Sequence, residues 1–371
     1  MVVSFVNSTH RWGGVKTWTL AVARGLTARG HRVHLCLRRG DPFLDACRDE
    51  GLPADGFRFG PDWNPLAVLA LTRAFRREGT WVVVTNVSKD NRVGGPAARG
   101  LGLPVLQRVG GPGDLRDRFK VRWEQRRYVD RIVVPGAAVK DALARFPWID
   151  AERKIRVVPN GVDLLRFRPG EGAGRLRSEL GLQASVPIVV TTGQLTPVKG
   201  HRFLLEGMAR GAFGEPRPVV VLIGSGPREG PLRELARSLG TADRVCFLGF
   251  RRDLPLLLED ADVVVQPSLM EGLPHSVVEF LAKGKAIVAT RLPGTGEAIE
   301  HGEHGILVPP GDGDALARAV AELLADPARR RRLGQAARKR AETEFALETM
   351  VDRMERLLED LASQGDGANR A

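Results

Sequence analysis

The chain has 371 residues, 43% of them hydrophobic, which is enough for two domains with sizeable cores. The formal net charge of +12 lies in the first 165 residues, which contain 28 Lys and Arg against 16 Asp and Glu. No apolar run approaches the length of a membrane span, and the three cysteines lack metal-ligand spacing, which argues against an integral membrane protein and a zinc domain. The apolar run at residues 1–6 lacks a basic leader, so we expect a first strand and a cytoplasmic protein.

A strand, a polar loop, a helix and a second strand are predicted at residues 1–6, 7–14, 15–29 and 32–37, and this order is typical of a parallel sheet. Gly13 and Gly14 stand where the helix begins, so the backbone there could approach a ligand closely. A plain tight turn explains the glycine pair equally well. Residues 41–80 alternate loop and helix and indicate little.

Two further strands are predicted at residues 81–86 and 103–109, and the first ends in a polar stretch that begins at Asn86. We expect that exit to face a ligand cleft, because open α/β sheets bind ligands at the carboxyl ends of their strands. Residues 114–131 are densely basic around three aromatic residues. Such a helix could lie on an anionic membrane, or it could be a solvated helix whose aromatic residues face the core. Its basic residues are Arg116, Arg118, Lys120, Arg122, Arg126, Arg127 and Arg131.

A strand that starts at Ile155 and a linker at residues 166–170 indicate a domain boundary, after which a second βα series begins. Its first strand, residues 188–192, leads through Lys199 into a helix at 202–210. A cation at a strand exit beside a helix start is well placed to meet a phosphate. Two such halves predict two facing doubly wound domains with a ligand between them.

The segment 268–285 carries two carboxylates, Glu271 and Glu279, with seven residues between them. Glu271 is predicted in a strand-to-helix loop and Glu279 in the first turns of the helix, which Pro274 would open as its first residue. The free N–H groups of such a helix start favour an anion. For this spacing alone, an acidic surface loop before an ordinary helix is the simpler interpretation.

Taken together, several segments in this order resemble family 4 of the retaining glycosyltransferases, which have the GT-B fold. The resemblance covers nearly the whole chain and is strongest from Ile155 to Pro310. Its carriers are VVPNGVD at 157–163, GQLTPVKG at 193–200, IGSGP at 223–227, VCFLGF at 245–250, the stretch 271–279 and GILVPPGD at 305–312.

The resemblance implies an α/β, GT-B fold of two facing Rossmann-like, doubly wound domains with an interdomain cleft. It places an acceptor-binding domain at 1–168, a nucleotide-sugar-binding domain at 169–345, and a C-terminal helix at 346–371 that crosses back to the first domain. The implied reaction moves a sugar, with UDP-sugars favoured, to a glycan or lipid-linked acceptor in cell-surface polysaccharide or lipopolysaccharide synthesis. Neither a metal nor a cofactor beyond the donor is expected, and no nucleic acid. An anionic membrane surface is an expected partner, on the inner face of the plasma membrane.

The resemblance also implies roles for single residues. Glu279 would bind the ribose hydroxyls of the donor, and Glu271 the hydroxyls of its sugar. Lys199 would neutralise the leaving diphosphate, a contribution that grows in the transition state. The diphosphate would also meet the backbone at Gly272, Leu273 and Pro274, with Gln194 nearby, while Gly249 and Phe250 line the base and Gly13 and Gly14 close on a phosphate. Asn86, Arg108, Lys120, Arg122 and Arg126 are expected on the acceptor or anion side.

Two positions depart from the family. Gln194 stands where the family usually has an arginine that partners Lys199, so the diphosphate loses one positive charge. Arg108, Lys16 or another basic residue would have to replace that charge. The strand at 106–109 also lacks the histidine that relatives often carry there, and Arg108 could occupy its space. These departures leave open a non-catalytic nucleotide-sugar-binding subunit. A GT-B relative with other chemistry, such as a nucleotide-sugar epimerase or a glycan phosphorylase, is the other alternative.

Overall fold

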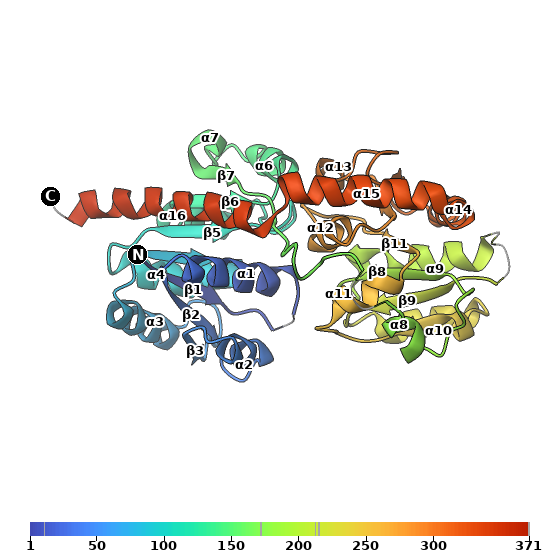
Figure 1. The fold of residues 1–371 in the computed structure, drawn as a ribbon. Coiled ribbons are helices and arrows are strands. Elements are labelled where there is room, and N and C mark those ends of the chain that lie inside the picture. The colour runs from blue at the N-terminus through green and yellow to red at the C-terminus, as the bar shows by residue number, and fades with distance from the viewer. Residues whose placement is uncertain (11, 171–172, 212, 214–215, 370–371) are drawn as a thin grey trace. The chain divides into compact units, whose positions relative to one another are not determined.

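The computed structural model describes residues 1–10, 12–170, 173–211, 213 and 216–369. The chain forms two compact units, one of residues 1–160 with 347–371 and the other of residues 161–346. The first unit therefore ends before the boundary expected at residue 168, and it includes the final helix of the chain (Figure 1).

The first unit contains a parallel sheet of seven strands in the order β3-β2-β1-β4-β5-β6-β7. The segment 41–80, which showed no clear pattern, contributes two helices and the edge strand β3. The elements are β1 (Val2–Asn7), α1 (Gly14–Ala28), β2 (Arg32–Arg38), α2 (Pro42–Asp49), β3 (Ala54–Phe57), α3 (Pro65–Glu78), β4 (Val82–Thr85), α4 (Ser88–Arg99), β5 (Val105–Arg108), α5 (Phe119–Tyr128), β6 (Arg131–Val134), α6 (Ala137–Ala144), α7 (Ala151–Lys154), β7 (Ile155–Val157) and α16 (Leu347–Asn369).

The strands of this sheet are apolar because helices cover both of its faces, as is usual for parallel sheets. One face packs against α1 and α16, which lie side by side (Figure 1). Its core joins β1 and α1 to the buried methionines and leucines of α16. Met350, Met354, Leu357 and Leu358 of the final helix are all buried in this core.

The second unit contains a parallel sheet of six strands in the order β10-β9-β8-β11-β12-β13. Helices alternate with these strands along the chain, so both units confirm the predicted α/β class. The elements are α8 (Arg175–Glu179), β8 (Ile188–Thr192), a 3₁₀ turn (Pro197–Lys199), α9 (His201–Arg210), β9 (Val219–Ile223), α10 (Glu229–Ser238), β10 (Val245–Phe247), α11 (Leu254–Leu257), β11 (Val263–Gln266), α12 (His275–Ala282), β12 (Ile287–Thr290), α13 (Pro293–Ala298), β13 (Ile306–Val308), α14 (Gly313–Ala325) and α15 (Pro327–Glu344).

Each sheet has one place where the strand order reverses, between β1 and β4 in the first unit and between β8 and β11 in the second. At such a switch point neighbouring loops diverge, which leaves room for a ligand at the carboxyl ends of the strands. A ligand site is therefore expected at the switch point of each unit. Within the described residues, no helix has both the length and the apolar character that crossing a bilayer requires.

Candidate active site

The switch point of the second unit brings together the loops that follow β8 and β11. Lys199 ends the 3₁₀ turn after β8, and Glu271 lies in the loop after β11. The Lys199 Nζ lies 2.5 Å from Glu271 Oε1, and both side chains are partly buried. A backbone hydrogen bond of 2.7 Å from Leu269 N to Val198 O also ties the two loops. Two of the residues expected at the donor site are thus in direct contact.

One oxygen of the Glu271 carboxylate accepts all of the hydrogen bonds that this carboxylate receives from described residues. Besides Lys199, Oε1 accepts from Ser268 Oγ at 2.7 Å and from Gln266 Nε2 at 3.1 Å. Gln266 is itself held, because its Oε1 accepts from Ser276 Oγ at 2.7 Å. Among the described residues, nothing bonds to Glu271 Oε2. The carboxylate is therefore fixed by one oxygen and can offer the other to a hydroxyl group.

Close backbone packing holds the loops that carry this pair. Gly200 has φ of +66°, and a Cβ at this position would stand 1.9 Å from Pro267 O at the exit of β11. At the start of α13, a Cβ on Gly294 would stand 1.4 Å from Gly272 O, directly after Glu271. Glycine is required at both positions because no side chain fits between these backbones.

Glu279 lies on α12 and is half-buried, and its carboxylate makes no hydrogen bond or ion pair with any described residue. Burial raises the pKa of its carboxyl to about 7, an effect that the positive charge of Arg166 partly offsets. A carboxylate with no side-chain partner in the described part of the chain is suited to accept hydrogen bonds from ligand hydroxyls.

We expect Glu279→Gln to stabilise the protein at pH 8 and to leave its stability at pH 4 unchanged. Because the folded state raises the pKa of Glu279, folding favours its protonated form, and stability falls as the pH rises from about 4.3 to about 7. Glutamine does not titrate, so the variant lacks this pH dependence. The gain in unfolding free energy at pH 8 is at most roughly 1.4 kcal/mol for each unit of pKa shift. Thermal unfolding at both pH values measures it, and an equal melting temperature at pH 8 would contradict the expectation.

The turn between Glu271 and α12 differs by one residue from its prediction. Pro274 was expected as the first helical residue, but its ψ of 128° makes it the N-cap, and the helix begins at His275. An extended conformation suits Pro274 because its fixed φ is common to both states. Gly272, Leu273 and Pro274 are buried, and the helix ends at Lys283, its C-cap, which is followed by Gly284.

The remaining donor-side residues follow other strands of the same sheet. Gln194 is the second residue after β8, in a loop where Leu195 N donates a hydrogen bond to Ser225 O at the exit of β9. Gly249, with φ of +64°, and Phe250, which is 46% exposed, follow β10. A 2.7 Å hydrogen bond from Gly224 N to Gly249 O joins the exits of β9 and β10.

The other predicted residues lie in the first unit. Gly13 and Gly14 are at the start of α1, and Gly13 is fully extended, a conformation that any residue can adopt. Asn86 and Arg108 are buried at the carboxyl ends of β4 and β5. Lys16, considered above as a substitute for the missing arginine, is buried in an ion pair with Asp41 at 2.6 Å. That partner occupies its charge, so Lys16 does not fill the role.

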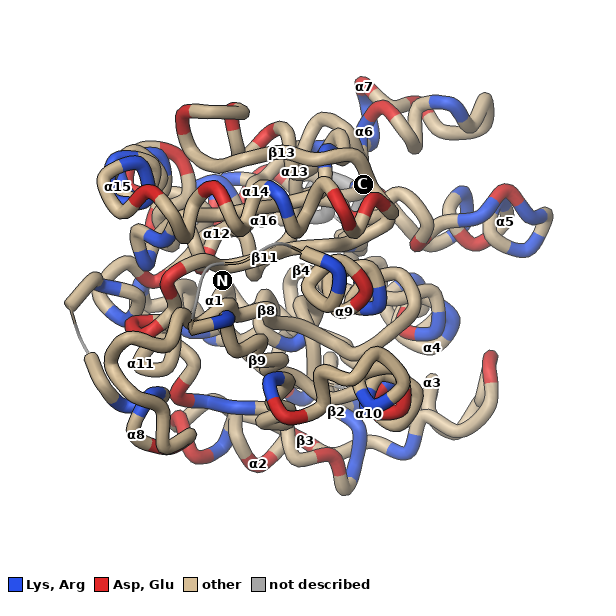
Figure 2. The backbone as a smooth tube through the Cα atoms, turned by 90° about the vertical axis from the view of Figure 1, so that its right-hand side faces the viewer, with Lys and Arg blue, Asp and Glu red and all other residues tan. Residues whose placement is uncertain are grey.

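The basic stretch contributes α5, on which Lys and Arg positions are blue in Figure 2. The side chains of Lys120, Arg122 and Arg126 are exposed. Arg122 forms a bidentate ion pair with Asp117, so its charge is partly compensated. Phe119 is 83% exposed and Trp123 is 44% exposed, which contradicts the interpretation in which the aromatic residues of this helix face the core. Tyr128 is half-buried, and Trp123 and Tyr128 pack with Trp63.

Gln266 and Ser268, which hold Glu271 in place, were not predicted as site residues from the sequence. Their polarity at the end of a buried valine strand was the available signal, since a polar residue there faces a loop rather than the core. His201 was missed as well. His201 is buried two residues after Lys199 in the chain. Burial and, to a smaller extent, the positive charge of Lys199 lower its pKa to about 4, so its imidazole is neutral at pH 7.

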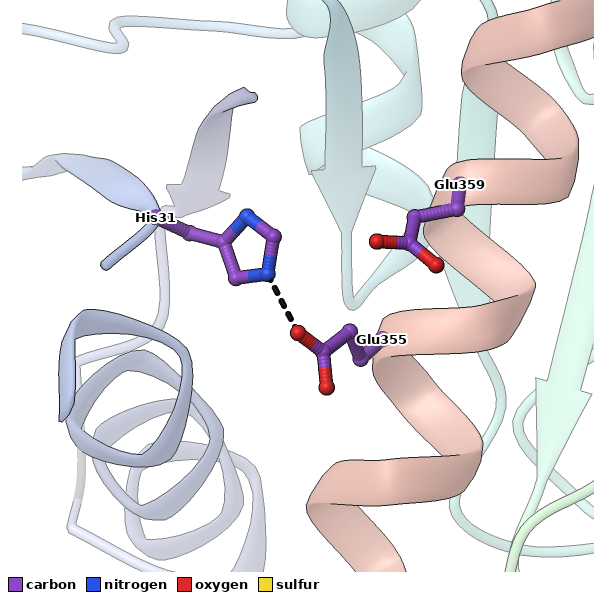
Figure 3. Close-up of side chains that lie close together, drawn as sticks. All are labelled: His31, Glu355 and Glu359. Carbon is purple, nitrogen blue, oxygen red and sulfur yellow. Dashed lines mark hydrogen bonds and ion pairs between the residues drawn. The ribbon is translucent and has the colours of Figure 1, made fainter. Parts of the chain in front are cut away.

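Two groups of side chains among the described residues have ligand atoms close enough to hold a metal ion, and neither includes Glu271 or Glu279. Figure 3 shows the first, His31 with Glu355 and Glu359 of α16, where His31 Nε2 lies 2.5 Å from Glu355 Oε1. The other oxygen of Glu355 accepts from Arg29 at 2.7 Å. Because Arg29 already supplies a positive charge, we interpret this group as an attachment of α16 to the start of β2. The second group is Glu300, Glu303 and His304.

Two protein families match this chain. Residues 12–166 match the family described as "Glycosyltransferase Family 4", and residues 174–340 match "Glycosyl transferases group 1". Lipopolysaccharide core biosynthesis glycosyltransferase LpsE of Rhizobium meliloti (strain 1021) is 30% identical over 244 residues, which cover 65% of this chain and 67% of LpsE.

A second curated relative is UDP-Gal:alpha-D-GlcNAc-diphosphoundecaprenol alpha-1,3-galactosyltransferase of Escherichia coli, 27% identical over 273 residues and 70% of each chain. The chain spans only about half the length of some other curated relatives, 48% of one and 47% of another. Among solved structures, Anabaena HepE in complex with UDP-glucose has a TM-score of 0.86 at 23% identity, over 97% of this chain and all of HepE. That likeness confirms the two-domain GT-B fold.

Proposed function

This chain belongs to family 4 of the GT-B glycosyltransferases, and on that premise we propose that it is a retaining enzyme that uses a nucleotide-sugar donor without a metal ion. The observation that carries the proposal is the arrangement in the second unit, where Lys199 contacts Glu271 at the switch point and the carboxylate of Glu279 has no partner among the residues that the structure describes. UDP is the favoured nucleotide, because UDP appears in the names of the Escherichia coli relative and the HepE complex.

In this proposal the donor lies across the exits of β8 and β11. Glu279 accepts hydrogen bonds from the ribose hydroxyls, and the Oε2 of Glu271 accepts one from the sugar. Lys199 has three N–H donors and gives one to Glu271, so it can also bond to the diphosphate, together with the backbone of residues 272–274. The loop of Gly249 and Phe250 lines the base.

Transfer breaks the bond between the anomeric carbon and the diphosphate oxygen and forms one between that carbon and the acceptor oxygen on the same face. The departing phosphate oxygen takes the proton of the acceptor hydroxyl. Negative charge grows on the diphosphate as the bond breaks, so Lys199 stabilises the transition state more than the bound donor. Gln194 adds hydrogen-bonding capacity but no charge.

The proposal is tested by release of free nucleoside diphosphate from UDP-, GDP- and ADP-sugars in the presence of EDTA. We expect slow hydrolysis of one donor without added acceptor, because water can replace the acceptor hydroxyl. If every donor is left intact and none binds, the assignment of the donor site is wrong. If turnover appears only after a divalent ion is added, the metal-independent mechanism is wrong.

We further propose that the acceptor is a glycan or a lipid-linked sugar of cell-surface polysaccharide, and that the first unit associates peripherally with an anionic membrane on its cytoplasmic side. The names of LpsE and of the Escherichia coli relative motivate the acceptor. Exposed cations on α5 next to exposed Phe119 and Trp123 motivate the membrane, since cations attract anionic lipid and aromatic rings enter the interface.

We expect the double substitution Lys120→Gln and Arg126→Gln to weaken binding to anionic vesicles about tenfold or more, at roughly 1 kcal/mol for each cation near the surface. Vesicle co-sedimentation at 50 mM and 300 mM salt measures it. The matched control is Arg331→Gln with Arg332→Gln, which removes the same charge from exposed positions on α15. Equal losses in both variants would show that only net charge matters, and salt-independent binding would exclude the electrostatic part of the proposal.

A further inference from the structure

Three polar side chains lie in register at the carboxyl edge of the first sheet. β1 pairs with β4 and β4 with β5 in a register that sets Val6 beside Thr85 and Thr85 beside Gln107. The next residues along the three strands are Asn7, Asn86 and Arg108. Because side chains alternate along a strand, this row lies on the same face as Phe5, Val84 and Leu106, which is the face covered by α1. The row crosses the switch point between β1 and β4.

Arg108 is a buried cation without a carboxylate partner among the described residues. It is only 6% exposed, its guanidinium carbon lies 5.0 Å from the ring centre of Trp18, and Nη2 donates a 3.4 Å hydrogen bond to Asn160 Oδ1. Asp114 acts on it only from a distance, because Asp114 Oδ2 accepts from the backbone N–H groups of Gly110 and Gly111. Burial lowers the pKa of Arg108 to about 10, which Asp114 partly offsets, so the side chain remains charged at neutral pH.

A second buried cation in the same unit shows the usual arrangement. Lys16 is as deeply buried as Arg108, and its ammonium lies between both oxygens of Asp41, at 2.6 and 2.7 Å. Buried charges are normally compensated in this way, because removing a charge from water is costly. The planar guanidinium of Arg108, oriented by the indole of Trp18, is instead suited to a bidentate contact with an external oxyanion.

Asn86, the neighbour of Arg108 in the row, has an unused acceptor. It is 5% exposed, its Nδ2 donates to Val6 O at 3.3 Å, and its Oδ1 has no partner among the described residues. Reversing the amide would set Oδ1 against the carbonyl of Val6, so the hydrogen bond fixes the orientation. A buried amide oxygen without a partner is costly, and a hydroxyl group from a ligand would satisfy it.

We propose that Arg108 and Asn86 form an acceptor subsite in which Arg108 binds an oxyanion and Asn86 Oδ1 accepts a hydrogen bond from a neighbouring hydroxyl. The acceptor is accordingly a sugar that bears a phosphate or a carboxylate group. This inference rests on the proposed transferase function, which it makes more specific: Arg108 selects the acceptor by charge and does not take part in the bond exchange.

The test is a calorimetric titration of the full chain with inorganic phosphate, glucose 6-phosphate, methyl glucuronide and methyl glucoside, with UDP present to occupy the donor site. We expect the anionic probes to bind at least about tenfold more tightly than methyl glucoside, a ratio that corresponds to one charge-assisted bidentate contact. In Arg108→Gln this preference is expected to disappear. Phosphate and glucuronide distinguish the two anions. The matched control is Arg76→Gln, which removes an exposed charge from α3 of the same unit.

The preference of the wild-type chain decides the inference even if Arg108→Gln does not fold. Equal affinity for glucoside and both anionic sugars would overturn it, as would unchanged anion binding in a folded Arg108→Gln. A second variant, Asn86→Asp, sets a carboxylate beside Arg108 and should abolish the anion preference while leaving the residue at 108 intact. Titration with UDP alone is the separate check on the donor site: normal UDP affinity without anion preference would reject this subsite and leave the transferase proposal standing.

Discussion

Replacing Glu271 by Gln is expected to lower kcat/KM for sugar transfer by about 10² to 10³, the usual loss when one polar contact to the transition state is removed. One oxygen of Glu271 accepts from Lys199, Ser268 and Gln266. The amide oxygen of glutamine can take this place, but its NH₂ group then replaces Oε2. The atom available to the donor sugar thereby changes from an acceptor to a hydrogen-bond donor, and Lys199 loses its counter-ion.

The measurement is steady-state kinetics of nucleoside diphosphate release, with thermal unfolding to verify the fold. Ser268→Ala removes one of the three donors and keeps the carboxylate, so it should reduce the rate by a smaller factor. Glu234→Gln, at an exposed position on α10, is the control for the change of charge and should have no effect. If Glu271→Gln turns over the donor within about threefold of wild type, the catalytic role assigned to Glu271 is wrong.

Replacing Gly294 by Ala is expected to have the second large effect, this time on both stability and activity. A Cβ there would lie 1.4 Å from Gly272 O, so α13 and the loop after Glu271 would have to separate. Overpacking usually costs about 1–3 kcal/mol, and we expect the upper end because the obstacle is backbone. A displacement of about 1 Å at a reacting group can cost about 10²-fold in rate, so the activity of the folded variant should fall by about that factor as well.

Gly296→Ala in the same helix is the matched control. Gly296 is exposed, and a Cβ there would have no neighbour within 4 Å, so alanine should stabilise α13 by about 0.5–1 kcal/mol. Chemical denaturation and diphosphate release would be measured for both variants. If Gly294→Ala matched Gly296→Ala in both measurements, the close contact between α13 and the Glu271 loop would not be essential.

Most of the fold could be predicted from the sequence because buried parallel strands are short apolar runs with polar or glycine exits. The run at 263–266 and the polar residues that follow it show this pattern clearly. β3 was not predicted, because Ala54–Phe57 is only half-buried at a sheet edge and contains an aspartate and a glycine. Pro274 was placed one residue too far into its helix, since proline fits an extended N-cap as well as a first turn.

The candidate site was only partly predictable, for a different reason. The spacing of Glu271 and Glu279 is local and could be read directly, but the contact of Lys199 with Glu271 joins residues far apart in the chain. It depends on β8 and β11 being neighbours, which strand patterns alone do not reveal. The exclusion of Lys16 likewise depends on Asp41, a residue in the segment that showed no pattern. Partners of this kind are fixed by topology.

The position of α16 in the chain has a consequence for biosynthesis. Residues 161–346 are continuous, so the second unit can fold as soon as they have left the ribosome. The first unit is synthesised earlier, yet its core requires Met354 and Leu358 from the last segment to be made. At a synthesis rate of about 5–20 residues per second, the apolar face of α1 stays without its contacts to α16 for many seconds. The half of the protein that is translated first is therefore completed last, and it is the half in which a nascent chain most needs protection from aggregation.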